Sequence, residues 1–99
     1  MKSIDRRKLF TALHRGCKPR GLVLTEDPDA GGGSHGSLIF ENAAGDKSLR
    51  LVIVYAREIS PGVQRGILRY VRQQAELRTA EADSSLARSI LELLTECLH

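Results

Sequence analysis

The spacing of hydrophobic residues changes twice along the chain, which divides it into a helical start, a β-rich middle and a helical end. From about Ile4 to Arg15, hydrophobic residues recur every three or four positions, the period of an amphipathic helix. Between residues 21 and 56 they fall in short runs bounded by Gly, Pro, Asn and Asp, which is typical of strands. From residue 60 onward the helical spacing returns. The pattern predicts one domain with the order helix, three strands, helix, helix.

The predicted first helix has a start signal and a stop signal. Ser3 can act as the N-cap, and Gly16 is expected to end the helix in a left-handed conformation, with Pro19 preventing its resumption. On a helical wheel the apolar residues share one side, which predicts that the other side is a basic surface. That basic side carries Arg7, Lys8, Thr11 and Arg15.

Three strands are expected at residues 21–25, 34–41 and 49–56, joined by turns rich in Gly, Asn and Asp. Two successive hairpins would give an antiparallel meander. The third strand is apolar on both faces, so we expect it to be central or well covered.

Two further helices are expected, and both have distinct faces. Ser60 and Pro61 are a strong helix start, and the pattern continues to Leu77. The last helix, about residues 84–98, has an apolar arc of roughly 160°, so we expect it to be covered by its own domain or by a partner. The polar side of the first of these helices carries Arg65, Arg69, Arg72 and Glu76.

These elements predict an α+β fold with a three-stranded antiparallel sheet and an α-β-β-β-α core, the layout of double-stranded-RNA-binding domains. The core is expected over residues 1–78, with residues 79–99 as a C-terminal helical extension.

Composition narrows the class of protein. Hydrophobic residues make up 41% and charged residues 27% of the 99, close to globular averages. The chain has no run of eighteen apolar residues and no signal-peptide pattern, so we expect a cytoplasmic protein with no membrane association. Cys17 and Cys97 have no metal-ligand or redox spacing, so we expect two small buried residues and neither metal nor cofactor.

Positive charge is concentrated at the start of the chain. The net charge is +3, but residues 1–20 contain seven Lys or Arg residues against Asp5 alone, a net charge of +6. Such a segment suits binding to a phosphate backbone. A solvated helix face would have the same composition, so both interpretations stay open.

Four motifs occur together in one order and spacing over residues 1–74. They are Met1-Lys2-Ser3, Gly33-Ser34-His35-Gly36 at a strand start, Leu51-Val52-Ile53-Val54, and Pro61-Gly62 followed by Ile67-Leu68. In these motifs the chain resembles the HicA family of mRNA interferase toxins from type II toxin–antitoxin systems. Gly36 stands where many relatives have a second His.

The resemblance implies a metal-independent endoribonuclease on a double-stranded-RNA-binding-like fold, whose catalytic residue corresponds to His35. It also implies mRNA as substrate and a HicB-like antitoxin protein as partner.

The chemistry of His35 supports this role independently of the resemblance. An unperturbed imidazole, with a pKa of about 6.5, can take the proton of a ribose 2′-hydroxyl near neutral pH, and the freed oxygen can attack the adjacent phosphate. His35 as an ordinary polar residue at a hairpin mouth is the alternative. The proton donor to the leaving oxygen stays open between Tyr55, a Lys or Arg side chain, and water. The expected RNA contacts are Ser34, Gly36, Ser37, Arg7, Lys8, Arg15, Arg65, Arg69 and Arg72.

Two other functions remain open from the sequence. One is an RNA-binding module without catalysis, which the single His of the motif favours. The other is an interaction protein that works through its apolar C-terminal helix, including a homodimer formed through that helix.

Overall fold

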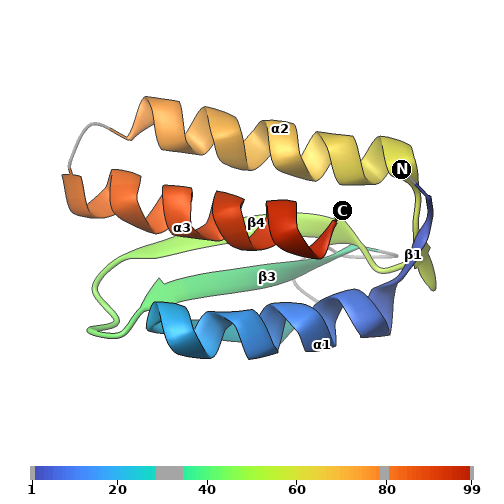
Figure 1. Cartoon of the computed structure of the whole chain (residues 1–99), viewed down its shortest axis with the longest axis horizontal. Helices are drawn as coiled ribbons and strands as arrows, with labels where there is room; N and C mark the ends of the chain where they lie inside the picture. Colours follow the sequence, from blue (N-terminus) through green and yellow to red (C-terminus); the bar gives the residue numbers. More distant parts are fainter. Residues whose placement is uncertain (1, 29–34, 79–80, 99) are drawn as a thin grey trace.

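The computed structural model describes residues 2–28, 35–78 and 81–98, and it has the α-β-β-β-α layout that the pattern predicts. Strands β2, β3 and β4 form an antiparallel sheet in that order, and β1 pairs with β5 in a separate two-stranded sheet. Helix α3 lies between α2 and α1 (Figure 1). The elements are β1 (Ile4–Asp5), α1 (Arg6–Cys17), the 3-10 helix η1 (Lys18–Arg20), β2 (Leu22–Asp27), β3 (His35–Asn42), β4 (Ser48–Val54), β5 (Glu58–Ile59), α2 (Pro61–Leu77) and α3 (Glu81–Cys97).

The first helix begins and ends two residues later than the sequence predicts. Its N-cap is Asp5, whose carboxylate accepts a hydrogen bond from the Lys8 backbone N–H at 3.1 Å. The helix begins later than expected because Ile4 and Asp5 form strand β1 and pair with β5. That hydrogen bond lowers the pKa of Asp5. The expected stop at Gly16 is wrong, since Gly16 lies inside α1 and the left-handed residue is Gly21, with φ of 66° after η1.

Gly16 serves close packing between two helices. A Cβ atom at this position would overlap the Cδ1 atom of Leu93 in α3. Leu93 is itself 1% exposed, so α1 and α3 approach each other across a position that has room only for hydrogen.

Helix α3, which makes up most of the expected C-terminal extension, packs into the core of the domain. Its apolar arc faces α1, α2 and the sheet, so the wide arc is covered by the chain itself. A homodimer or partner complex through that arc would require α3 to leave the core. The buried residues of the arc are Leu86, Ala87, Ile90, Leu93, Leu94 and Leu98.

The central strand is β3, and β4 is an edge strand, so a central position for β4, one of the two alternatives expected from its apolar sequence, is wrong. Residues of β4 alternate between a buried face, which includes Leu51 and Ile53, and a face on which Val52 is 56% exposed. The apolar residues on the outer face therefore do not mark a central position. They contribute to the groove described below.

The start of α2 matches its sequence signals. The Ser60 hydroxyl accepts a hydrogen bond from the Val63 backbone N–H at 3.3 Å, with Pro61 as the first helical residue. One turn on, the buried side-chain amide of Gln64 donates to the carbonyl oxygens of Lys2 at 2.6 Å and Ile59 at 2.9 Å. Gln64 thereby fastens the beginning of the chain and β5 to α2.

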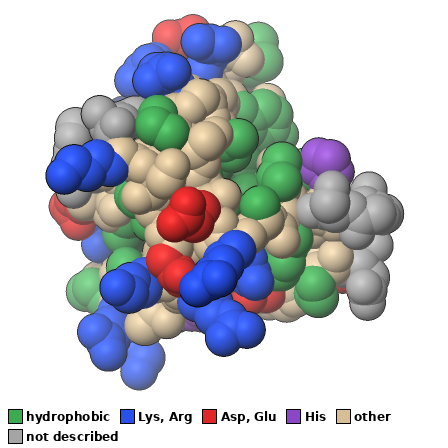
Figure 2. Space-filling view, turned by 90° about the vertical axis from the view of Figure 1, so that its right-hand side faces the viewer, with side chains coloured by type: hydrophobic (Ala, Val, Ile, Leu, Met, Phe, Trp, Pro, Cys, Tyr) green, Lys and Arg blue, Asp and Glu red, His purple; other side chains and the backbone are tan. Residues whose placement is uncertain are grey.

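Both α1 and α2 begin at the same end of the molecule, where the two-stranded sheet of β1 and β5 lies (Figure 1). Figure 2 looks at this end, and Lys and Arg side chains gather in its lower half, where α1 begins. Among the described helices, none has both the length and the apolar content needed to cross a bilayer.

Candidate functional site

His35 is the first residue of β3, and its side chain is exposed at the end of the sheet. It lies opposite Val54, the last residue of β4, in the antiparallel register. No hydrogen bond or ion pair to another described residue engages the imidazole. The ring is therefore available to a bound molecule.

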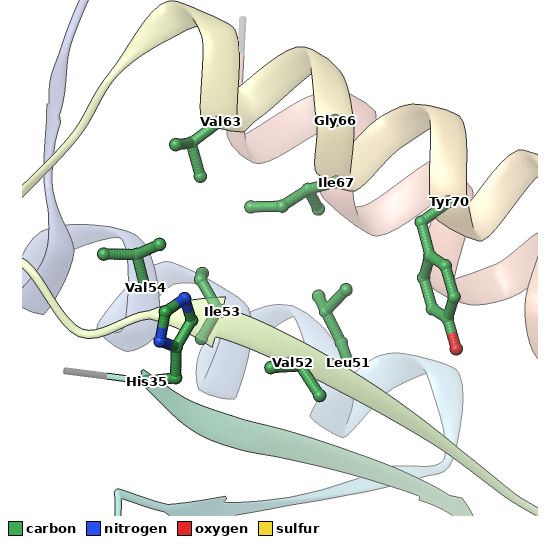
Figure 3. Close-up of a pocket in the computed structure, with 9 residues that line it drawn as sticks. All are labelled: His35, Leu51, Val52, Ile53, Val54, Val63, Gly66, Ile67 and Tyr70. Atoms are coloured by element: carbon green, nitrogen blue, oxygen red, sulfur yellow. The ribbon is translucent and has the colours of Figure 1, made fainter. Parts of the chain in front are cut away.

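The imidazole points into a groove between β4 and α2 (Figure 3). The groove has a volume of about 460 Å³, and no Lys, Arg, Asp or Glu is among the described residues that form its walls. Of these described residues, His35 and Tyr70 carry the ionisable side chains. The walls consist of His35, Leu51, Val52, Ile53, Val54, Val63, Gly66, Ile67 and Tyr70.

The two residues that follow His35 do not offer accessible groups to phosphate. Gly36 is buried on the opposite face of the sheet, and a Cβ atom there would meet the Tyr55 ring at 2.5 Å. A second His at this position would therefore collide with Tyr55, which explains the glycine. Ser37 is 0% exposed, and its hydroxyl has no hydrogen-bond partner among the described residues. As folded here, Gly36 and Ser37 are thus buried and cannot make the expected RNA contacts, and Ser34 lies outside the described residues.

Tyr55 belongs to a cluster on the α1 side of the sheet. The Arg6 guanidinium lies 4.5 Å from its ring centroid, and the Phe10 ring packs edge-on against it at 5.5 Å. Its hydroxyl donates to the Glu26 carboxylate at 3.2 Å, and Glu26 also contacts His14 at 2.8 Å. Burial, followed by the Glu26 charge, raises the pKa of Tyr55. Tyr55 is thus held on the α1 side of the sheet and does not line the groove.

Three arginines meet at the end of the molecule shown in Figure 2. Arg6, Arg7 and Arg57 line a depression of about 420 Å³ together with Asp5. Two contacts to the segment after β4 hold it together: the Arg6 backbone N–H donates to the Arg57 carbonyl at 2.9 Å, and the Arg6 Nε donates to the Ala56 carbonyl at 3.1 Å. This arrangement of cations suits a phosphate group.

The arginine cluster is connected to the groove through β4. Val54, opposite His35, precedes Arg57 by three residues, a chain length of at most about 10 Å. His35 and these cationic side chains therefore lie at the same end of the sheet.

The basic residues expected from the two helices are exposed but do not flank His35 from both sides. Arg7, Lys8 and Arg15 share one face of α1, as predicted, and line a shallow depression of about 350 Å³. The α2 arginines are exposed and none of them lines the groove. The reason is the rotation of α2, which turns Val63, Gly66, Ile67 and Tyr70 toward β4. The α2 residues concerned are Arg65, Arg69 and Arg72.

Sequence reasoning missed the arginine cluster and the groove. Arg57 approaches Arg6 only because β1 pairs with β5, and two-residue strands leave no periodic signal. The groove depends on β4 being an edge, which its sequence alone does not disclose.

The cysteines have no role at this site. Cys17 and Cys97 are free thiols at the ends of α1 and α3, and burial raises the pKa of each. Within the described residues, no group of three or more His, Cys, Asp and Glu residues could hold a metal ion.

Comparison of the chain with models of known protein families, with curated protein sequences and with solved structures finds no match.

Proposed function

We propose that this protein is an endoribonuclease that cleaves mRNA with His35 as its catalytic base, in the manner of the HicA toxins that its motifs resemble. The observation that carries the proposal is the position of His35, an exposed imidazole without a partner among the described residues, directed into a groove of substrate size. The sequence resemblance and the arginine cluster at the same end of the sheet support it.

The proposed reaction uses the ribose 2′-hydroxyl as the nucleophile. A nitrogen of the His35 imidazole takes the proton of that hydroxyl, and the 2′-oxygen attacks the adjacent phosphorus. The bond from phosphorus to the 5′-oxygen then breaks, and water protonates that oxygen. The products are a 2′,3′-cyclic phosphate and a 5′-hydroxyl end, and DNA is not cut because it lacks the nucleophile.

The arginines bind phosphate and do not transfer protons. Arg6, Arg7 and Arg57 would hold phosphates next to the cleaved bond, and Lys8 and Arg15 would extend the basic track along α1. In the cell, the proposal places the protein in the cytoplasm with a HicB-like antitoxin that covers the site.

The test is cleavage of single-stranded RNA, with DNA of the same sequence as a control and a chelator present throughout. We expect the wild-type protein to cut RNA only, and His35→Ala to lower the rate by about 100-fold or more. His14→Ala is the matched control and should cut as the wild type does, because His14 pairs with Glu26 outside the groove. An unchanged rate in His35→Ala, or no cleavage by the wild type, would refute the proposal.

A second candidate is RNA binding without cleavage. It is favoured by the groove walls, which bring no acid or second histidine to His35 among the described residues. Salt-sensitive RNA binding without cleavage products would select this function.

A further inference from the structure

One wall of the groove is the open edge of β4. The carbonyl oxygens of Ser48 and Arg50 point toward α2, since they accept hydrogen bonds from the Arg78 guanidinium at 3.4 Å and the Tyr70 hydroxyl at 3.3 Å. Backbone groups alternate sides along a strand. The N–H and C=O groups of Val52 and Val54, two and four residues after Arg50, therefore also face α2, and no described strand pairs with β4 on that side. The groove is thus apolar in its side chains but has hydrogen-bond donors and acceptors along one edge.

The groove has two defined ends. Tyr70 reaches from α2 to the Arg50 carbonyl and closes one end, while His35 stands opposite Val54 at the other. Residues 50 to 54 of β4 span about 13 Å at 3.3 Å per residue. A volume of about 460 Å³ lies within the range of small-molecule sites.

This combination suits a flat, neutral group with a polar edge. Such a group could hydrogen-bond to the β4 backbone and place its faces against Val63, Ile67 and the Tyr70 ring. A nucleobase has this chemistry, and unpaired bases commonly bind on aromatic side chains through their hydrogen-bonding edges.

Charge favours a base carried on a polyanion over an apolar peptide. Three arginines line the depression at the same end of the sheet as His35, and they would attract the phosphates of a strand whose base enters the groove. An apolar peptide strand would gain nothing from them.

We propose that the groove between β4 and α2 binds one unpaired base of the RNA next to the cleaved phosphate, and that it thereby sets the base preference of cleavage. The proposal rests on the function proposed above, because it takes the ribose of that base to lie against His35.

Gly66 offers a way to fill the groove without disturbing the fold. It lies on α2 within the groove wall, and a Cβ atom there meets no other atom within 4 Å. A leucine in its place would project into the space that the base occupies. Gly62→Leu is the matched control, because Gly62 is exposed on the same helix but does not line the groove.

The experiment compares five proteins on two kinds of RNA. His35→Ala is used for binding, since it leaves the RNA intact, alone and combined with Gly66→Leu or Gly62→Leu. The RNAs are a short single strand and the same strand with one abasic sugar, placed at the preferred cleavage position or, where the wild type does not cut, at each position in turn. Cleavage maps of the wild-type protein and of Gly66→Leu complete the set.

We expect the abasic sugar to weaken binding to His35→Ala by about 10-fold, and Gly66→Leu to weaken binding of the intact strand to the same extent. In the Gly66→Leu background the abasic sugar should have no further effect, and the base preference of cleavage should disappear. Gly62→Leu should bind as the parent does.

Equal binding of the two RNAs, or an unchanged cleavage preference in Gly66→Leu, would overturn the base site while leaving the nuclease intact. Absence of cleavage by the wild type, with the abasic effect still present, would overturn the nuclease and keep the base site. Binding of an apolar peptide that Gly66→Leu abolishes, without any abasic effect, would assign the groove to a protein strand instead.

Discussion

Replacing glycine by alanine should have opposite effects on stability at two positions, both inside helices. Gly16 in α1 faces Leu93 of α3, and an added methyl group would overlap the Leu93 Cδ1 atom. Gly66 in α2 has open space at the same point. The comparison therefore separates the packing of α1 against α3 from the intrinsic preference of alanine for helices.

The magnitudes follow from two general terms. Alanine is favoured over glycine in a helix interior by about 1 kcal/mol, and this term applies to both positions. Overpacking a well-packed core costs about 1–3 kcal/mol, and it applies to Gly16 alone because Leu93 is buried. Gly66→Ala should therefore be about 1 kcal/mol more stable than the wild type, and Gly16→Ala should be less stable than Gly66→Ala by about 1–3 kcal/mol.

Thermal unfolding followed by circular dichroism measures the difference. For a domain of this size, 1 kcal/mol corresponds to roughly 4–8 °C in Tm, so the two variants should differ by at least roughly 4 °C. The double variant Gly16→Ala with Leu93→Ala tests the cause, because removing the Leu93 branch should turn the alanine at position 16 from harmful to favourable.

Stabilisation of Gly16→Ala equal to that of Gly66→Ala would refute the reasoning. It would mean that α1 and α3 do not approach closely at Gly16. Helix α3, residues 81–97, would then pack less tightly against α1 than it does in the structure.

Two further predictions concern the interactions around the site. Burial, followed by the Glu26 charge, raises the pKa of Tyr55 above its ordinary value of 10.0. The stabilisation from its protonated hydroxyl is therefore complete below that ordinary value, which applies to the unfolded chain, and is lost as the pH rises through the higher pKa of the folded state. Urea unfolding should therefore show a smaller loss of stability above about pH 10 in Tyr55→Phe than in the wild type, whereas parallel curves would contradict this. Gln64→Ala leaves the Lys2 and Ile59 carbonyls without their donor, so it should destabilise the protein by about 1–3 kcal/mol. It should also accelerate hydrogen exchange in β1 and β5, and unchanged exchange there would show that Gln64 does not hold the start of the chain.

Signals that lie within one element were sufficient to predict the fold. Ser60 and Pro61 mark the start of α2 correctly, because a capping side chain and a restricted φ act locally. The short apolar runs bounded by Gly, Pro, Asn and Asp predict the three strands of the meander for the same reason. Gly16 shows where such reasoning fails, since a glycine that ends a helix and a glycine that lets two helices approach have the same sequence signature.

The candidate site was predictable only in part, because its components come from distant segments. The position of His35 at the start of β3 followed from its own strand. The burial of Ser37 and the collision that excludes a side chain at Gly36 depend on residues that pack across the sheet. The approach of Arg57 to Arg6 depends on a pairing between residues more than fifty positions apart.

The protection of the β4 edge is uneven, and the gap coincides with His35. An open strand edge promotes aggregation, so proteins usually cover it. Here Tyr70 of α2 caps the carbonyl of residue 50, and Arg78, just after α2, caps that of residue 48. Arg6 engages the carbonyls of residues 56 and 57, which follow the end of β4. Residues 52–54 lie between these two covered stretches and face a groove without charged walls. The stretch of the β4 edge that no described side chain caps therefore ends opposite His35, which is the position that the proposed base site requires.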